Sequence, residues 1–285
     1  MKSLVWFITG ASRGFGFEIA RAALERGDAV VAAARDPHVV ERALGRREQL
    51  LTVELDVTDE RQAQAAVKAA LTRFGQIDVL VNNAGRGLLG AIEEASAEEV
   101  RSVFAVNVDG LLNVTRAVLP SMRARRSGRI LNLSSVGGFG AWAGWGVYCA
   151  TKFAVEGLSE ALHAELLPLG IQVTVIEPGT FRTDFLDASS LRRVARVIGE
   201  YSGSSGTARQ WADATNHDQL GDPVKGAAAI VAVATSPEPP LRLQLGTDSL
   251  ARVEAKLAQV AAELAAWRTL AESTDRDQAA PVWTA

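Results

Sequence analysis

The chain has a single cysteine among 285 residues, Cys149, so it cannot form a disulfide within itself. Such scarcity is typical of proteins kept in a reducing cytosol, and we expect a cytoplasmic location. A net charge of −3, from 30 basic and 33 acidic residues, argues against nucleic-acid partners. No run of about 18 apolar residues is present, and the apolar N-terminal segment enters a glycine turn without a cleavage site. We therefore expect neither a membrane span nor a signal peptide.

Short apolar runs recur along the chain, separated by longer Ala-, Leu-, Glu- and Arg-rich segments of helical period. Continuous apolar strands joined by helices are typical of a parallel sheet that is buried on both faces. We therefore predict an α/β fold, a single Rossmann-type doubly wound domain over residues 1–248 with helices on both faces of about seven parallel strands. The expected strands are residues 4–9, 29–34, 50–55, 79–81, 129–134, 172–177 and 241–246.

Two segments interrupt this alternation. Residues 184–222 are rich in Ser, Asp, Gly and Thr, with a short helical pattern at 190–201. Because a long excursion inside an α/β domain is usually functional, we predict that it forms a substrate-binding lid. Residues 249–272 have a long helical pattern after the last strand, and we expect 249–285 to form a C-terminal helical extension and tail.

A glycine-rich turn follows the first expected strand. Its sequence, TGASRGFG (residues 9–16), places glycines at positions 10, 14 and 16 directly before a helical segment. Glycine permits a tight turn and a close approach of the backbone to a ligand, and the helix start offers N–H groups to a phosphate. Many structural turns are also rich in glycine, but the position between a strand and a helix favours dinucleotide binding.

The end of the second expected strand indicates which dinucleotide is bound. A carboxylate there would bind the adenosine ribose hydroxyls and repel a 2′-phosphate, but this chain has Ala34 followed by Arg35. Arg13 lies in the glycine turn, and a guanidinium binds a phosphomonoester through two parallel hydrogen bonds. Both could be ordinary surface arginines, as we expect Arg21 and Arg26 to be. Their positions favour NADP(H) as the cofactor.

Tyr148 and Lys152 are four residues apart in the segment GVYCATKFAVEGL, so an α-helix places them on one face. A tyrosine phenol has a pKa of about 10, and a nearby ammonium favours the phenolate and lowers that pKa toward neutrality. The pair therefore suits general acid–base catalysis. The same spacing is common in purely structural helices, so the assignment depends on the surrounding motifs.

These motifs occur with five others, and together they resemble the single-domain short-chain dehydrogenase/reductases. A serine thirteen residues before the tyrosine is catalytic in that family, which corresponds to Ser135 here. The resemblance implies that Asn107, Ser135, Tyr148 and Lys152 are catalytic and that no metal takes part. The long C-terminal helix is similar to the ending of the hydroxysteroid and retinol dehydrogenase-like subgroup. The motifs are TGASRGFG (9–16), LDVT (55–58), NNAG (82–85), Asn107 in AVNVDG, LNLSS (131–135), YCATK (148–152) and EPGTFRT (177–183).

The resemblance also implies a nucleotide site along the glycine turn and the strand ends. Asp56 and Val57 would contact the adenine, and Phe181 would lie beside the nicotinamide, where the family usually has a small aliphatic residue. Without the resemblance, Asp56 would be read as a helix N-cap and Asn107 as an ordinary helix residue. The implied cofactor-binding residues are Gly10, Ser12, Arg13, Phe15, Gly16, Arg35, Asp56, Val57, Asn83, Ala84, Gly85, Tyr148, Lys152, Pro178, Gly179, Phe181 and Thr183.

The implied reaction is hydride transfer between a nicotinamide and a carbonyl or CH–OH carbon. Tyr148 would be the general acid or base, Lys152 would lower its pKa and hold the ribose, and Ser135 would donate a hydrogen bond to the substrate oxygen. Asn107 would interrupt its helix and anchor a water. The alternatives are a cofactor-sensing protein without activity, a β-ketoacyl-carrier-protein reductase and a nucleotide-sugar epimerase or dehydratase. The intact serine, tyrosine and lysine favour an enzyme.

The substrate is indicated by aromatic residues near the catalytic pair. Phe139, Trp142 and Trp145 lie between the expected catalytic serine and tyrosine, spaced by glycines. Such a loop forms an apolar pocket wall, although packing in the core or at a subunit interface would explain the rings equally well. Trp211 in the excursion could close over the same space. We expect a small hydrophobic ketone, aldehyde or secondary alcohol as substrate, and a homodimer or homotetramer.

Overall fold

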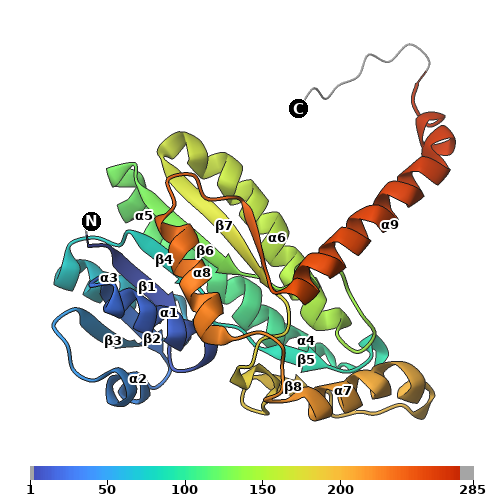
Figure 1. Cartoon of the computed structure of the whole chain (residues 1–285), viewed down its shortest axis with the longest axis horizontal. Coiled ribbons are helices and arrows are strands. Elements are labelled where there is room, and N and C mark those ends of the chain that lie inside the picture. The colour runs from blue at the N-terminus through green and yellow to red at the C-terminus, as the bar shows by residue number, and fades with distance from the viewer. Residues whose placement is uncertain (1–2, 277–285) are drawn as a thin grey trace.

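Seven parallel strands form the central sheet of the computed structural model, which describes residues 3–276 (Figure 1). The strands are β1 (Val5–Thr9), β2 (Ala29–Ala34), β3 (Leu50–Glu54), β4 (Val79–Asn82), β6 (Gly128–Leu133), β7 (Ile171–Pro178) and β9 (Arg242–Leu245). Their order in the sheet is β3-β2-β1-β4-β6-β7-β9, and each neighbouring pair is parallel. Each strand coincides with one of the apolar runs, so the predicted doubly wound sheet is confirmed.

Helices cover both faces of this sheet (Figure 1). The α-helices are α1 (Gly14–Glu25), α2 (Pro37–Leu44), α3 (Glu60–Phe74), α4 (Ala97–Phe104), α5 (Gly110–Arg125), α6 (Gly146–Leu166), α7 (Thr207–Thr215), α8 (Pro223–Thr235) and α9 (Thr247–Glu272). Successive side chains of a strand point to opposite faces. Trp6 and Ile8 therefore pack in one apolar cluster with α1, α2 and α8, while Phe7 packs in another with α3, α5 and α6.

One helical stretch, Ala97–Arg125, meets the length and hydropathy of a membrane span. It comprises α4, the π turn η2 (Ala105–Asp109) and α5, and it corrects the expectation that no stretch would qualify. Half of its most apolar window is buried inside the protein, where Val114 and Met122 belong to the core cluster on one face of the sheet. In this fold the stretch packs as a core helix.

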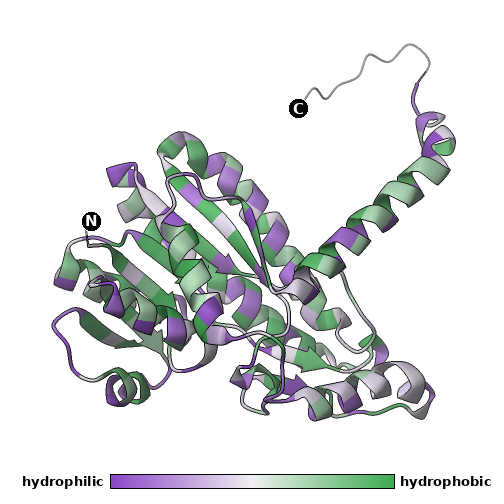
Figure 2. Cartoon of the chain, in the orientation of Figure 1, coloured by the Kyte–Doolittle hydropathy of each residue, from purple (hydrophilic) through white to green (hydrophobic). Residues whose placement is uncertain are grey.

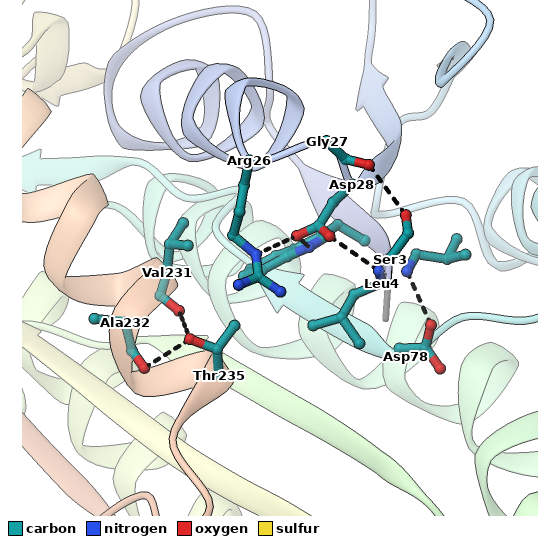
Figure 3. Close-up of polar contacts among 11 residues, drawn as sticks. Ser3, Leu4, Arg26, Gly27, Asp28, Asp78, Val231, Ala232 and Thr235 are labelled. Atoms are coloured by element: carbon teal, nitrogen blue, oxygen red, sulfur yellow. Dashed lines mark hydrogen bonds and ion pairs between the residues drawn. The ribbon is translucent and has the colours of Figure 1, made fainter. Parts of the chain in front are cut away.

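A buried carboxylate holds the amino-terminal edge of the sheet (Figure 3). Asp28 is 1% exposed and accepts hydrogen bonds from the backbone N–H of Leu4 at 3.0 Å and from Nε1 of Trp6 at 2.9 Å. It also accepts a bond from Nε of Arg26 at 2.8 Å. These bonds join the start of β1 to the turn that leads into β2, and they lie at the edge opposite the carboxyl ends of the strands.

The excursion at residues 184–222 folds differently from the prediction. It contains the strand β8 (Leu191–Arg193), which pairs in parallel with β5 (Gly87–Leu89) outside the main sheet. The helical pattern predicted at 190–201 is therefore wrong over most of its length, because only the short turn η6 (Gly199–Tyr201) is helical there. Pairing with a distant strand overrides a weak local preference.

The predicted C-terminal helix is present as α9, which begins at Thr247 and ends at Glu272. Figure 1 shows that most of this helix projects away from the rest of the protein. Of the predicted tail after this helix, residues 277–285 lie outside the part of the chain that the structure describes.

Candidate active site

A cavity of about 920 Å³ lies at the carboxyl-terminal edge of the sheet. The strand order reverses between β1 and β4, and clefts in open α/β sheets form at such a point. The structure brings the implied catalytic and cofactor-binding residues together in the wall of this cavity, with the exceptions of Gly16 and Asn107. We call it the sheet-edge cavity.

The glycine turn between β1 and α1 forms one end of this cavity. Gly10 and Gly14 have positive φ angles of 65° and 54°, a conformation that favours glycine. A Cβ on Gly16 would lie 2.4 Å from the carbonyl oxygen of Gly10, so only glycine lets α1 start this close to β1. Asp36 and Asp59 cap the starts of α2 and α3, but no side chain caps α1. Its backbone N–H groups can therefore serve an anionic ligand.

Two implied cofactor residues also hold the loops of this end in place. Asn83 donates through Nδ2 to the carbonyl oxygens of Thr9 at 2.9 Å and Gly10 at 3.2 Å. Asp56 accepts hydrogen bonds from the backbone N–H and the hydroxyl of Thr58, at 2.9 and 2.7 Å. Because α3 is capped by Asp59, the alternative reading of Asp56 as a helix cap is wrong. Asp56 closes a turn and lines the cavity.

Arg13 does not project freely toward a ligand. Its Nη2 donates to the carbonyl oxygen of Ser189 at 3.0 Å and to the hydroxyl of Ser190 at 2.8 Å. The guanidinium thereby joins the glycine turn to the excursion, which the sequence did not predict. Arg35, the other arginine proposed for the 2′-phosphate, is exposed and lines the cavity.

Three further arginines line the cavity and were missed, Arg86 and Arg192 near Arg35, and Arg252 over the ring of Trp142. Burial lowers the pKa of Arg86, and the positive charges of Arg35 and Arg192 lower it further. This effect places the three guanidinium groups near one another, with Asp56 as a nearby acid. Arg86 directly follows the NNAG motif and could have been considered, whereas Arg192 stands in a segment without a motif.

The implied catalytic side chains converge at the middle of the cavity. Tyr148 and Lys152 lie on α6, and Ser135 follows β6. A Cβ on Gly137 would be 3.4 Å from Oγ of Ser135 and 3.5 Å from Cε1 of Tyr148. The Ser135 hydroxyl lies close enough to the phenol to lower the pKa of Tyr148. Lys152, which is 6% exposed, donates through Nζ to the carbonyl oxygen of Leu133 at 2.7 Å.

The pKa values of this pair correct one expectation. Burial raises the pKa of Tyr148, and the nearby Ser135 hydroxyl opposes this effect without cancelling it. The positive charge of Lys152 does not offset this burial, because its Nζ lies 5.8 Å from the ring centroid and is directed at the Leu133 carbonyl. Burial also lowers the pKa of Lys152, to about 8. At neutral pH the phenol is therefore protonated and the amine is charged.

Asn107 lies behind the catalytic pair, in the π turn η2. Its Oδ1 accepts from the backbone N–H of Arg86 and its Nδ2 donates to Oγ1 of Thr151, both at 2.9 Å. A Cβ on Gly85 would be 3.4 Å from Asn107 Oδ1 and 3.7 Å from Lys152 Nζ. The predicted interruption of the helix at Asn107 is confirmed. The water that it was predicted to anchor stays a prediction.

Aromatic rings form the other end of the cavity. Trp145 lies edge-on to Tyr148 at a centroid distance of 5.9 Å and to Trp211 at 6.4 Å. Of the residues predicted for this wall, Trp142, Trp145 and Trp211 line the cavity and Phe139 does not. The excursion therefore contributes to the wall next to the catalytic tyrosine.

Two phenylalanines shape the space between these ends. Phe181 packs on Phe15 at 4.9 Å, and a Cβ on Gly226 of α8 would approach its ring to 2.9 Å. The large residue at position 181 is thus accommodated by a glycine on the neighbouring helix. Phe185, which the sequence did not single out, lies 5.4 Å from the ring of Tyr148.

A buried acidic pair was also missed, formed by Glu156, one helical turn beyond Lys152 on α6, and Glu177 on β7. The guanidinium Nε of Arg242 is 3.3 Å from Oε2 of Glu156 and 3.4 Å from Oε1 of Glu177. Burial raises the pKa of Glu156, to about 7, and the neighbouring Glu177 contributes to this rise. Cys149 is also buried, and burial raises the pKa of its thiol to about 11, so it is protonated and unreactive at neutral pH.

Comparison with known proteins finds one family along most of the described sheet. The profile of the short chain dehydrogenase family matches residues 4–193. An oxidoreductase from Botryotinia fuckeliana, BOA17, is 37% identical over 93% of this chain and 97% of that protein. A 3-ketodihydrosphingosine reductase from Bacteroides thetaiotaomicron is 36% identical over 86% of this chain and 89% of that protein.

Solved structures agree with this similarity. A short-chain dehydrogenase from Streptomyces avermitilis is 40% identical and superposes with a TM-score of 0.90, covering 96% of this chain and 99% of that chain. A short chain dehydrogenase/reductase from Burkholderia phymatum, in complex with NAD, is 27% identical with a TM-score of 0.79 and covers 99% of both chains. A serine dehydrogenase complexed with NADP⁺ is 31% identical with a TM-score of 0.70, covering 85% of this chain and 94% of that chain.

Proposed function

This chain belongs to the short-chain dehydrogenase family, and we propose that it is an NADP(H)-dependent oxidoreductase that interconverts a hydrophobic ketone or aldehyde and its alcohol. The proposal depends on one observation, the convergence of Ser135, Tyr148 and Lys152 in the wall of the sheet-edge cavity. A structural role for this helix would not require a phenol and a serine hydroxyl to meet in a cavity that also reaches the glycine turn. The complete set of three favours an enzyme over a cofactor sensor.

The glycine turn suits a nicotinamide dinucleotide. Gly10 and Gly16 let the backbone approach a ligand closely, and the uncapped start of α1 offers N–H groups to a pyrophosphate. Family members of known structure hold NAD or NADP⁺, which supports the same class of cofactor here. When bound, the nicotinamide would supply or accept the hydride.

In the reducing direction, Tyr148 donates its proton to the carbonyl oxygen as negative charge develops there. Its raised pKa keeps this proton available at neutral pH. Ser135 donates a hydrogen bond to the same oxygen, which stabilises the developing charge. The ammonium of Lys152 stabilises the phenolate that remains after the transfer. The closeness of Ser135 and Tyr148, which both lie within 3.5 Å of a Cβ built on Gly137, supports this scheme, because both hydroxyls must reach one oxygen atom.

A preference for NADP(H) is supported by the charge at the adenosine end of the cavity. Arg35, Arg86 and Arg192 line this end, and a cluster of guanidinium groups is stabilised by a phosphomonoester. Arg35 is exposed at the end of β2, where the 2′ position of the adenosine ribose is expected. Because Arg13 is bonded to the excursion, we assign the main contact with the 2′-phosphate to Arg35.

A hydrophobic substrate is supported by the aromatic end of the cavity. Trp145, Trp211 and Phe185 form a largely apolar wall beside Tyr148, and such walls bind apolar ligands through burial of their surface. Because Trp211 and Phe185 come from residues 184–222, we assign this segment the role of a substrate-binding lid. The relative from Bacteroides thetaiotaomicron is by name a reductase of a keto compound, which favours a ketone.

Reduction of hydrophobic ketones, followed through the absorbance of NADPH, tests this proposal. We expect Tyr148→Phe to lower kcat by about 100- to 10,000-fold, because it removes the proton donor, while NADPH binds with an unchanged Kd. The chain has one other tyrosine, Tyr201, whose hydroxyl bonds Glu93 at 2.6 Å outside the cavity lining. Tyr201→Phe is the matched control and should retain activity. Equal turnover in the two variants would reject the assignment of the acid.

Cofactor preference is tested separately by titrating NADPH and NADH. We expect NADPH to bind more tightly, and Arg35→Ala to weaken NADPH about tenfold while NADH is unaffected, because only NADPH carries the 2′-phosphate. Arg42→Ala, on the exposed surface of α2 and outside the cavity lining, is the control. A wild-type preference for NADH, or an equal effect of Arg35→Ala on both cofactors, would contradict the assignment.

A further inference from the structure

The C-terminal helix α9 contacts the rest of the described protein only near its start. Asp248 accepts two hydrogen bonds from Thr180, from its N–H and its hydroxyl, both at 2.8 Å. Ser249 is 0% exposed and Val253 is 8% exposed. From residue 254 onward, every described residue except the half-buried Lys256 is exposed. About five helical turns therefore project without support, as Figure 1 shows.

An apolar seam at regular spacing runs from the first turn of α9 into its projecting part. Large apolar side chains recur at positions 250, 253, 257, 260, 264 and 267, with steps of 3, 4, 3, 4 and 3 residues. This is the heptad pattern of a coiled coil, with Leu250, Leu257 and Leu264 at one core position and Val253, Val260 and Trp267 at the other. Val253 is already covered by its own chain, and the other five are exposed. Leu257 is 55% exposed, Leu264 63% and Trp267 66%. Figure 2 shows apolar residues recurring along the helix.

Such a seam requires a partner in water. A lone helix of this length is only marginally stable, and most helical stability in proteins comes from packing of an apolar face. A membrane surface does not suit α9, because its polar positions carry four acidic residues and three basic ones, without the basic excess of interfacial helices. A second helix with the same periodicity fits the seam better.

The charges that flank the seam indicate a second copy of the same helix. Lys256 and Glu263 occupy the equivalent flanking position in successive heptads. When two α9 helices run antiparallel with Leu257 opposite Val260 of the other copy, each Lys256 faces the Glu263 of the other copy. The same register sets Leu250 opposite Trp267, and all contacts occur twice by symmetry. A surface that complements itself in this way is typical of a twofold homodimer.

We propose that α9 is an assembly helix, which pairs with α9 of a second copy of this chain in an antiparallel coiled coil along the seam from Leu250 to Trp267. The seam is about 25 Å long, from 17 residues at 1.5 Å each. This pairing covers the exposed leucines and the tryptophan, and it places the catalytic domains of the two copies at opposite ends of the helix pair.

The mass of the full-length protein in solution tests the pairing. We expect Leu257→Glu with Leu264→Glu to halve the mass measured by sedimentation velocity, because two charges per helix enter the seam. The control is Ala255→Glu with Ala262→Glu, which adds the same charge on the outer face of the same helix and should leave the mass unchanged. The chain mass is 30.2 kDa, so dissociation of a dimer gives a clear shift. A wild-type monomer, or a seam variant of unchanged mass, would overturn the proposal.

Engineered cysteines test the orientation. The one native cysteine, Cys149, is 1% exposed and gives little background. Under mild oxidation, Leu250→Cys with Trp267→Cys should form a disulfide-linked dimer, because these positions are about 25 Å apart within one helix and meet only between antiparallel helices. Each single variant should remain uncrosslinked. A dimer formed by either single variant, or no dimer from the double variant, would reject the antiparallel pairing.

Discussion

The two edges of the central sheet hold buried charge in opposite ways. At the amino-terminal edge, the Asp28 carboxylate is surrounded by donors from Leu4, Trp6 and Arg26 at 2.8 to 3.0 Å (Figure 3). At the carboxyl-terminal edge, burial lowers the pKa of Lys152 to about 8, and its Nζ donates a hydrogen bond to the Leu133 carbonyl at 2.7 Å. A buried charge with many donors stabilises a fold, whereas one with a displaced pKa is poised for proton transfer.

This difference suggests that buried charges at the carboxyl-terminal edge serve activity, whereas those at the amino-terminal edge serve stability. Groups at the carboxyl-terminal edge gain function from an environment that disfavours their charged forms, and this reduces the stability of the folded state. The groups around Asp28 at the amino-terminal edge are not in the cavity lining, and we expect them to support the fold alone. Substitutions at the two edges should therefore change different measured quantities.

The largest expected effect concerns Lys152. We expect Lys152→Met to lower kcat/KM about 1000-fold, or about 4 kcal/mol, because the phenolate of Tyr148 loses its neighbouring ammonium. The melting temperature should be equal to or higher than that of the wild type, because a buried cation is replaced by an apolar chain of similar length. Steady-state kinetics and thermal unfolding of one preparation measure both. A fall of many degrees in melting temperature would show that Lys152 stabilises the fold, and would contradict the proposed difference between the two edges.

The opposite result is expected for Asp28. Asp28→Ala should lower the free energy of unfolding by about 2–4 kcal/mol, because the indole N–H of the fully buried Trp6 loses its acceptor. Kinetic constants measured below the melting temperature should be unchanged. Asp36→Ala, which removes the exposed cap of α2, is the control and should cost only about 1 kcal/mol. Denaturant unfolding distinguishes the two, and similar losses would show that Asp28 has no special role.

The sequence predicted the central sheet well because its strands are buried on both faces and therefore read as unbroken apolar runs. It also predicted which side chains share the cavity, since the carboxyl ends of parallel strands meet at one edge. Tyr148 and Lys152 were found because the spacing of a helix alone puts them on one face. In each case a local pattern determines the outcome.

What the sequence could not predict depends on contacts between distant segments. Arg192 lies near Arg86 only because β8 pairs with β5. No local sequence pattern predicts that pairing. The bond between Arg13 and the excursion has the same origin. The raised pKa of Tyr148 was missed because it results from burial, whereas the spacing to Lys152 predicted the opposite direction. Burial depends on the whole fold.

A smaller effect is expected from pH. The pKa of about 8 for Lys152 means that the ammonium is present below pH 8 and lost above it. Ketone reduction should therefore show a kcat/KM that is level below pH 8 and falls about tenfold per unit above it, because this parameter reports the free enzyme. Lys152→Arg keeps its charge at high pH, so any activity that it retains should lack this decline. An identical decline in that variant would assign the titration to another group.

The smallest expected effect is that of Glu156 on the pKa of Lys152, two residues of the same helix, α6. The carboxylate of Glu156, one turn beyond Lys152 on α6, raises the pKa of that lysine and partly opposes its burial. Glu156→Gln removes the negative charge, so the lysine pKa should fall below 8 and the alkaline decline should move by up to about one unit toward lower pH. The rate at pH 6 should stay the same, because Lys152 remains charged there.

Glu160→Gln is the matched control for this shift. Glu160 lies one turn further along α6, is more exposed and pairs with Arg242, which also pairs with Glu156. Its removal should leave the pH profile unchanged, because solvent screens its charge from Lys152. A rate that falls equally at all pH values in Glu156→Gln would indicate that this residue only supports the helix. A displaced decline with a constant rate at pH 6 would instead show that the buried acid sets the charge of the catalytic lysine.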